Sequence, residues 1–324
     1  MTAIVVRKFG GPEVLVPEDL PVPQPGPGQV LVRIAAAGVN PADTYARSGA
    51  PRPGGTALPY TPGTDGAGTV EALGPGVGSV AVGDRVFLGR SVTGTYAEMA
   101  LALESQVYPL PDRLTFAQGA GVYVPYATAF HSLVQRAAVR PGETVLVHGA
   151  SGGVGVASIQ WCRRLGVEVW GTAGTDPGRE LVLAQGAGRV FDHRTEGYRD
   201  QILEATGGRG VDVILEMAAH VNLGHDLKLV APGGRIVVIG SRGDVTVTPR
   251  DLMSRRAAVL GVMLWQVTEA EAAEIRKELA KGLADGGLSP VVGRELPLAQ
   301  ASEAHRLVLE PGAYGKIVLF PGQR

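Results

Sequence analysis

The segment 144–156, which reads TVLVHGASGGVGV, constrains the fold more than any other part of the chain. An apolar run typical of a buried strand leads into a cluster of small residues, and an apolar helix is expected to follow. Small residues let the backbone approach a pyrophosphate, which the free N–H groups and dipole of the helix stabilise. Gly149, Gly152 and Gly155 keep a three-residue spacing, although Ala150 stands where the G-x-G-x-x-G motif has its first glycine. The segment predicts a dinucleotide-binding turn, with an ordinary glycine-rich turn as the alternative.

From about residue 124 the chain alternates apolar strands with helical stretches, the pattern of βαβ units and a parallel sheet. Strands are expected at 144–148, 167–172, 189–192, 212–216, 235–239 and 259–264. Helices are expected between them at 153–165, 177–186, 197–206, 222–230 and 249–256. Six strands with intervening helices match a doubly wound sheet, which favours the dinucleotide interpretation of the glycine segment.

The first third of the chain has a different pattern, with short apolar runs between proline and glycine clusters. Such punctuation indicates a barrel-like or sandwich-like β unit. The segment 268–285 predicts an amphipathic helix, and 315–320 predicts a strand that rejoins the β-rich unit. We therefore predict a β-rich domain of residues 1–123 and 266–324, into which a dinucleotide-binding domain of residues 124–265 is inserted.

Charge and cysteine content exclude several classes of partner and site. The chain has 30 basic and 31 acidic residues and a formal net charge of -1, so it lacks the broad basic field that would favour nucleic acid. Its one cysteine, Cys162, can form neither an internal disulfide nor a multi-thiolate zinc site. The N-terminus does not resemble a signal peptide, and no apolar run is long enough to span a membrane. We therefore expect a cytoplasmic protein.

The end of the second predicted strand bears on the choice of nicotinamide cofactor. NAD-specific sites usually place an acid about 20 residues beyond the loop to hold the ribose hydroxyls, whereas Thr172, Ala173 and Gly174 are uncharged. An uncharged strand end tolerates a 2′-phosphate that a carboxylate would repel, which favours NADPH. Arg179 follows a few residues later and is a candidate partner of that phosphate, with a solvated first-turn arginine as the alternative.

The sequence lacks metal ligands with catalytic spacing. Asn40 lies in the turn AGVNPAD, where zinc dehydrogenases of this size need a thiolate, and the six histidines show no metal spacing. An alkoxide is not stabilised without a Lewis acid, so the chemistry is expected to suit an acceptor that needs little activation. A quinone has this property because its reduced form is a stabilised aromatic diolate.

Several motifs together resemble one family over essentially the whole chain. They are GVNPADTYARSG at 38–49, LPYTPGTDGAG at 58–68, VLVHGASGGVG at 145–155, GTAGT at 171–175 and GGRIVVIGSRG at 233–243. With these motifs the chain resembles the zeta-crystallin-like NADPH:quinone oxidoreductases, a zinc-free branch of the medium-chain dehydrogenase/reductase superfamily. The resemblance implies an α/β protein with a GroES-like β-rich catalytic domain and a Rossmann domain built on a doubly wound parallel sheet. It also implies electron transfer from NADPH to a small-molecule quinone or another electrophilic acceptor, as one-electron or as hydride transfer.

The same resemblance implies a set of residues that contact NADPH in the pyrophosphate loop, at the adenosine end, beside the nicotinamide and on the catalytic-domain side. They are Ser151, Gly152, Gly153, Val154, Gly174, His193, Asn222, Ile239, Gly240, Ser241, Arg242, Val262, Met263, Leu264, Asp43 and Thr44. Asn40, Tyr45 and Tyr126 are candidates for the substrate pocket, as wall or hydrogen-bonding groups. The loop 48–57 lacks a tyrosine that relatives often carry after the Arg-Ser-Gly turn, and Pro51 lies near that place. We expect this loop to shape the acceptor pocket.

Two other functions are compatible with the same scaffold. One is an NADPH-dependent reductase of 2-alkenals or enones, for which alkenals would be turned over faster than ortho-quinones. The other is an NADPH-binding protein with a structural or RNA-binding role, since relatives have such roles. The near-neutral charge gives RNA binding little independent support.

The last predicted strand, 259–264, is a candidate for an apolar sheet edge. Related folds pair this strand across a dimer, and an unpaired apolar edge favours aggregation. We therefore expect a homodimer or a tetramer, with an edge covered by its own chain as the alternative.

Overall fold

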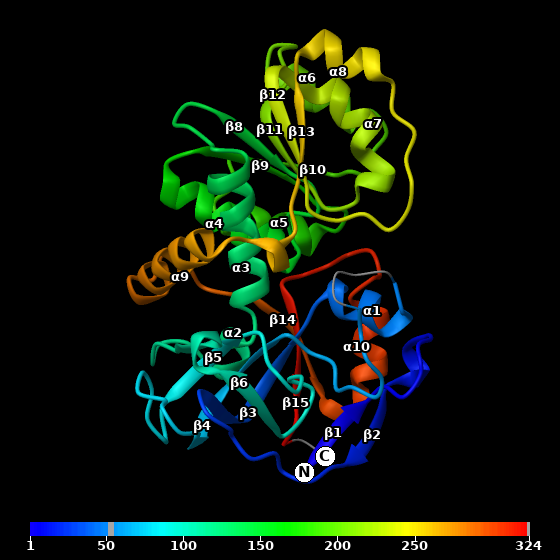
Figure 1. Ribbon diagram of the computed structural model, residues 1–324. Helices are drawn as coiled ribbons and strands as arrows, with labels where there is room; N and C mark the ends of the chain where they lie inside the picture. Colours follow the sequence, from blue (N-terminus) through cyan, green and yellow to red (C-terminus); the bar gives the residue numbers. More distant parts are fainter. Residues whose placement is uncertain (51–54, 323–324) are drawn as a thin grey trace. The chain divides into compact units, whose positions relative to one another are not determined.

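The computed structural model describes residues 1–50 and 55–322, which form two compact units (Figure 1). The β-rich unit contains Met1–Val124, Ser289–Glu310 and Gly315–Arg324. The parallel-sheet unit contains Pro125–Leu288 and Pro311–Tyr314. The boundaries expected from the sequence, 123/124 and 265/266, differ from these chiefly over residues 266–288.

Short strands build the β-rich unit. A two-stranded sheet pairs β1 (Thr2–Val5) with β2 (Val16–Asp19). The larger sheet has the order β14-β15-β3-β4-β5-β7, and β6 pairs with β3. Its strands are β3 (Gln29–Val39), β4 (Asp65–Leu73), β5 (Arg85–Gly89), β6 (Met99–Leu103), β7 (Val107–Pro109), β14 (Val292–Pro297) and β15 (Lys316–Phe320). The C-terminal strand β15 pairs antiparallel with β3, which confirms the strand predicted at 315–320 and its return to the β-rich sheet.

The helices of this unit are short. They are η1 (Pro12–Val14), α1 (Pro41–Ser48), η2 (Glu104–Gln106), α2 (Phe116–Gly119), η5 (Leu298–Gln300) and α10 (Ala301–Leu307). Alternate residues of a strand point to the same face of a sheet, and Val30, Val32 and Ile34 of β3 are buried on one face in the core of the unit. This packing holds α1 and the end of β3, which carry candidate site residues, on a rigid sheet.

A six-stranded parallel sheet forms the centre of the second unit. Its strands are β8 (Thr144–Val147), β9 (Glu168–Thr172), β10 (Arg189–Phe191), β11 (Val211–Glu216), β12 (Val230–Val238) and β13 (Ala258–Gly261). Their spatial order is β10-β9-β8-β11-β12-β13, which is the doubly wound order 3-2-1-4-5-6 when the strands are counted along the chain. The predicted doubly wound sheet is therefore confirmed. Ligands of such sheets bind beyond the carboxyl ends of the strands, where the order reverses; here that point lies between β8 and β11.

Helices flank this sheet, as Figure 1 shows. They are α3 (Tyr123–Phe130), in which the unit boundary falls, the π-helix η3 (His131–Arg136), α4 (Gly153–Leu165), α5 (Asp176–Ala184), α6 (Tyr198–Ala205), α7 (Ala219–Leu229), α8 (Pro249–Arg255), η4 (Leu264–Gln266) and α9 (Glu269–Ala284). Leu146, Ile214 and Ile236 of three adjacent strands are fully buried, as expected for a parallel sheet covered on both faces. Within the two described ranges, no helix is long and apolar enough to cross a lipid bilayer.

Helix α9 belongs to the parallel-sheet unit, whereas the sequence placed it with the β-rich unit. Its start follows the sequence signals, because Thr268 accepts a hydrogen bond from the backbone N–H of Glu271 in a capping box. Its apolar side, with Ile275 and Leu279, is buried, and Gln135 of η3 donates to the backbone oxygen of Glu271 at 3.1 Å. An amphipathic pattern shows which side of a helix is buried but not which core covers it.

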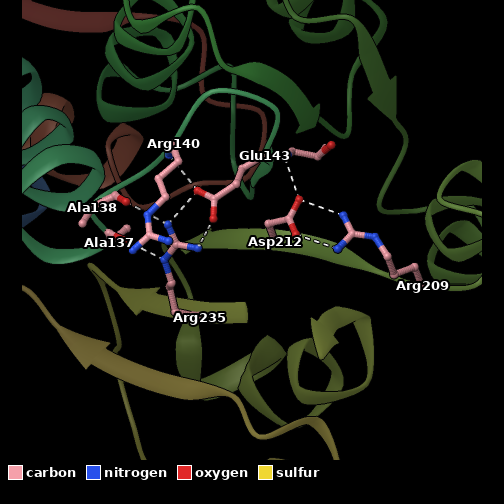
Figure 2. A network of polar contacts seen from close by, with 8 residues as sticks. Ala137, Ala138, Arg140, Glu143, Arg209, Asp212 and Arg235 are labelled. Atoms are coloured by element: carbon pink, nitrogen blue, oxygen red, sulfur yellow. Dashed lines mark hydrogen bonds and ion pairs between the residues drawn. The ribbon is translucent and has the colours of Figure 1, made fainter. Parts of the chain in front are cut away.

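A polar network stabilises the end of the parallel sheet at which β8 and β11 begin (Figure 2). Arg235 donates to both carboxylate oxygens of Glu143 at 2.7 Å. Arg209 pairs with both oxygens of Asp212 at 2.7 and 2.9 Å, and Asp212 also accepts the backbone N–H of Thr144 at 2.9 Å. The glycine turn lies at the carboxyl ends of the strands, so this network at their amino ends stabilises the sheet without touching the turn.

Candidate cofactor and substrate site

The glycine turn lies between β8 and α4, where the strand order reverses. Gly149 has a φ of +61°, a conformation that favours glycine. A Cβ at Gly155 would lie 2.5 Å from the Cα of Ala150, so only glycine lets α4 start this close to the turn. The methyl group of Ala150 fills the space beside Gly171 of β9, where a Cβ would be 2.6 Å away. The departure from the glycine motif at position 150 thus has a packing reason in the neighbouring strand.

The four residues predicted to cradle a pyrophosphate form the start of α4. They are Ser151, the N-cap residue Gly152, Gly153 and Val154. Ser151 is buried, and its hydroxyl donates to the backbone oxygen of Ala313 at 2.6 Å, which fixes the turn. The first N–H groups of a helix have no acceptor within the helix, and together with the helix dipole they attract an anion. The turn therefore fits a dinucleotide diphosphate.

Two basic side chains lie against Gly174, which follows β9. A Cβ at Gly174 would be 2.8 Å from Nε2 of His193 and 2.9 Å from Nε of Arg194, so both side chains lie directly against this strand end. Arg194 is exposed, and its Nε is 3.9 Å from the nearest oxygen of Asp192. Burial lowers the pKa of His193. Arg194 was not predicted as a site residue, although its place shortly after the third strand of the parallel sheet was a signal that could have identified it.

Arg179, the predicted partner of a 2′-phosphate, is held by two carboxylates. Its Nη1 donates to Asp192 at 2.8 Å, and its Nη2 pairs with Asp176 one turn earlier in α5. Its charge is therefore balanced within the unit. Because two carboxylates already bind Arg179, the interpretation as a first-turn residue describes it better than the interpretation as a phosphate ligand. The sequence could not show this, since it does not reveal which acids lie beside Arg179.

Asn222 lies in α7 and contacts a buried acid. Its Nδ2 donates to Oε1 of Glu216 at 3.3 Å, and the backbone N–H of Ala218 donates to the same oxygen. Glu216 is fully buried beside His148 and Asp226. Burial raises the pKa of Glu216 to about 7, and the charge of Asp226 adds to this rise, whereas His148 opposes it.

The residues predicted to contact the nicotinamide follow β12 and β13. Ile239 and Gly240 both donate their backbone N–H to the carbonyl oxygen of Glu216, at 2.9 and 3.2 Å. A Cβ at Gly240 would lie 2.5 Å from the carbonyl oxygen of Met217, so the two strand ends are in close contact. Ser241 is exposed in the loop that follows, and the adjacent Arg242 donates its backbone N–H to His220 at 3.2 Å.

The strand predicted at 259–264 ends earlier, at Gly261. Val262 still donates its backbone N–H to the oxygen of Val238 at 3.0 Å. Met263 is exposed, and Leu264 is the buried first residue of the turn η4. The prediction was too long because the apolar run 259–264 continues beyond the strand, and its last residue, Leu264, is buried in a helical turn rather than in the sheet.

In the β-rich unit, Asn40 is the N-cap residue of α1, and its amide is bound on both sides. Its Nδ2 donates to Asp65 at 3.0 Å, and its Oδ1 accepts from the ammonium of Lys316 at 2.5 Å. Lys316 also pairs with Asp65 at 2.9 Å, and all three side chains are buried. This arrangement supports a positioning role for Asn40 rather than the predicted substrate contact. It does not fit a zinc ion, because the Lys316 ammonium already binds the oxygen atoms at this turn.

The other predicted residues of α1 differ in their exposure. The carboxylate of Asp43 accepts the backbone N–H of Asn40 at 2.9 Å and the Tyr96 hydroxyl at 3.4 Å, and burial raises its pKa to about 6. Thr44 is buried, and its hydroxyl donates to the oxygen of Pro41. Tyr45 is half-buried, so it is the member of this group that a ligand can reach.

Tyr126 is a core residue of the parallel-sheet unit, contrary to the prediction of a substrate contact. It is 1% exposed, and its hydroxyl donates to Gln160 at 2.8 Å. Burial raises the pKa of its phenol well above the usual range. Trp161 donates its indole N–H to the backbone oxygen of Tyr126 at 3.1 Å, which fixes α3 against α4. Pro51, which stands near the place where relatives often carry a tyrosine, is outside the described residues.

The chain is similar to known oxidoreductases over almost its whole length. The family model "Alcohol dehydrogenase GroES-like domain" matches residues 26–112, and "Zinc-binding dehydrogenase" matches residues 153–281. Quinone oxidoreductase of Homo sapiens is 46% identical over 324 residues, which cover 99% of this chain and 98% of the relative. A solved NAD-dependent alcohol dehydrogenase is 34% identical with a TM-score of 0.91, over 99% of this chain and 100% of that one. The Escherichia coli quinone oxidoreductase complexed with NADPH is 30% identical with a TM-score of 0.87, over the same shares.

Proposed function

The chain belongs to the quinone oxidoreductases of the medium-chain dehydrogenase/reductase superfamily, and from this membership we propose that it transfers electrons from NADPH to quinones without a metal. The observation that carries the proposal is the glycine turn at the reversal point of the parallel sheet, beside the uncharged end of β9, where His193 and Arg194 lie close to Gly174. The turn fits the diphosphate, and the basic pair fits the 2′-phosphate that distinguishes NADPH from NADH.

The residues around the turn would hold the cofactor from one end to the other. The N–H groups at the start of α4 bind the diphosphate, and Arg194 with His193 binds the 2′-phosphate in place of Arg179. The nicotinamide half is held by the segments that follow β11, β12 and β13, namely Asn222, Ile239, Gly240, Ser241, Arg242, Val262, Met263 and Leu264. NADPH supplies the reducing electrons when bound.

Within the β-rich unit, α1 carries the candidate residues for the acceptor. Asp43 fixes the start of this helix, and Tyr45 is the candidate residue in it that a ligand can reach. The Lys316 ammonium and Asp65 hold Asn40, so the turn before α1 keeps one conformation. The main tasks of the protein are to position the acceptor and to exclude water during electron transfer. No protein group has to donate a proton, because the reduced quinone can take its protons from solvent afterwards.

Steady-state kinetics with a panel of acceptors tests this function. NADPH oxidation is followed by its absorbance with ortho-quinones, para-quinones and 2-alkenals, with and without a chelator. We expect quinones to give the larger kcat/KM and the chelator to have no effect. Faster turnover of alkenals would establish the double-bond reductase, and tight NADPH binding without any accelerated oxidation would establish a binding protein.

We also propose a homodimer and a cytoplasmic location. Strand β13 is an edge of the parallel sheet, and its Val259 is 41% exposed. A second copy that pairs with this strand would cover the exposed apolar edge.

A further inference from the structure

Three titratable side chains are buried together where the strand order reverses. His148 follows β8, Glu216 ends β11 and Asp226 lies in α7, and their exposed fractions are 3, 0 and 0%. Burial of charged groups is unfavourable unless they are paired and hydrogen-bonded. The partners of this cluster therefore indicate what it does.

The histidine connects the two acids to the glycine turn. Its Nε2 lies 3.0 Å from Oδ1 of Asp226 and 3.7 Å from Oε2 of Glu216. Its Nδ1 lies 3.3 Å from the hydroxyl of Thr172, which accepts the backbone N–H of Gly149 at 3.2 Å. One imidazole therefore links the two acids, through Thr172, to the first glycine of the turn.

Glu216 connects the same cluster to the segments proposed to hold the nicotinamide half. Its Oε1 accepts the backbone N–H of Ala218 and the Nδ2 of Asn222. Its backbone oxygen accepts the N–H groups of Ile239 and Gly240. One residue therefore fixes α7 and the end of β12 relative to β11.

Two oxygens of the cluster lack a donor. Among the described residues, Oε2 of Glu216 and Oδ2 of Asp226 are buried without a hydrogen-bond partner. Ligand atoms of His148, Glu216 and Asp226 all lie within 4.8 Å of one another, and Asp226 raises the pKa of Glu216, so a proton held between the two carboxyl groups would satisfy both oxygens. The charged and titratable groups that interact with the cluster are Arg199 and Tyr198 of α6, His225 of α7, and His193 after β10.

We propose that Glu216 is a positioning residue for NADPH, and that with His148 and Asp226 it forms a buried network that takes up a proton when the cofactor binds. The proposal rests on the proposed function. NADPH brings several negative charges close to the turn, so binding is favoured when the network carries one negative charge fewer. Release of the proton leaves two neighbouring carboxylates buried next to the turn, and the added negative charge opposes the binding of the anionic cofactor.

The pH dependence of NADPH affinity tests the proposal. Glu216 has a pKa of about 7 in the folded protein, so the proton is held below this pH and lost above it. Between about pH 6 and pH 9 we expect the Kd of the wild type for NADPH to rise about fivefold, at the lower end of typical coupling between linked binding events. The variant Glu216→Gln keeps the acceptor Oε1 and replaces the protonated oxygen with a donor amide. Its Kd for NADPH should therefore lack the fivefold rise that Glu216 causes in the wild type. The phosphate of NADPH titrates identically with both proteins, so the ratio of the two Kd values isolates the network.

The control is Glu143→Gln, in the polar network at the amino ends of the strands (Figure 2). It makes the same chemical change in an acid that does not contact the turn, so it should keep the wild-type profile. Asp226→Asn replaces the other half of the carboxyl pair and takes the place of Glu216→Gln if that variant does not fold.

Three results would overturn the proposal. The first is a Glu216→Gln profile that parallels the wild type. The second is a stoichiometric metal ion in the purified protein that is lost in His148→Ala, because His148, Glu216 and Asp226 have atoms close enough to share a cation. The third is a wild type that binds no NADPH at any pH, which would refute the proposed function as well and is distinguished from the first by the wild-type titration alone.

Discussion

A single exposed guanidinium is the side chain best placed to separate NADPH from NADH. Arg194 lies against Gly174 and is loosely paired, whereas Arg179 is bound by two acids. We expect Arg194→Gln to weaken NADPH binding by about 1.5–3 kcal/mol, the range for a hydrogen bond to a charged group. This is about ten- to hundredfold in Kd, and the Kd for NADH should stay unchanged. Titration of both cofactors by fluorescence measures the effect.

Arg179→Gln is the matched control for that experiment. It removes a guanidinium from the same neighbourhood, but it also frees Asp176 and Asp192 from their partner. A larger loss of NADPH affinity in Arg179→Gln than in Arg194→Gln would return the phosphate role to Arg179, as the sequence first indicated.

The buried ammonium of Lys316 shows how the β-rich unit stabilises the turn before α1 without a metal. Lys316 compensates Asp65 and orients Asn40, and Asp65 also accepts the backbone N–H of Val124 at 3.0 Å. Breaking a buried ion pair leaves an uncompensated charge, so these residues depend on one another. The sequence predicted Asn40 as a substrate-pocket residue, whereas its contacts with Asp65 and Lys316 make it part of the framework.

At the scale of elements, the start of α4 depends on one close backbone approach. Gly155→Ala would place a Cβ 2.5 Å from the backbone of Ala150, and overpacking of this kind costs about 1–3 kcal/mol. We expect a lower Tm and a weaker NADPH affinity, because the turn has to move away from the helix. Thermal unfolding and NADPH titration measure the two effects.

The control glycine lies in another helix of the same unit. A Cβ at Gly224 in α7 would be 3.6 Å from its nearest neighbour, the oxygen of Thr246, which is an ordinary contact. Gly224→Ala should therefore stabilise the unit by about 0.4–1 kcal/mol through the unfolded state. Equal effects of the two substitutions would show that the contact with Ala150 does not restrict the turn.

The elements that could be predicted are those whose periodicity and caps are local. The strands of the parallel sheet and helix α4 follow from apolar runs and glycine signals, and the capping box at Thr268 follows from its spacing to Glu271. The assignment of α9 to a unit could not be predicted, since it depends on contacts with η3. The same holds for Tyr126, where helix periodicity cannot tell that Gln160 accepts its hydroxyl.

At the scale of the whole molecule, the remaining question is what covers the edge of the parallel sheet. Strand β13 pairs with β12 on one side, and among the described strands none pairs with its other side. Ala258 and Val259 are exposed, and natural proteins avoid a free apolar edge because it templates association. A dimer that continues the sheet from one copy into the next removes this edge in both copies at once.

Substitution on this edge tests the assembly directly. We expect the wild type to have twice the 33.6 kDa mass of one chain in light scattering. Val259→Lys places a charge where the second copy would pair, so it should shift the protein to monomers with an intact fold. Val82→Lys, at a more exposed valine of the β-rich unit, should leave the dimer unchanged. A wild type that is already monomeric, or a Val259→Lys variant that remains dimeric, would mean that another surface or the chain itself covers β13.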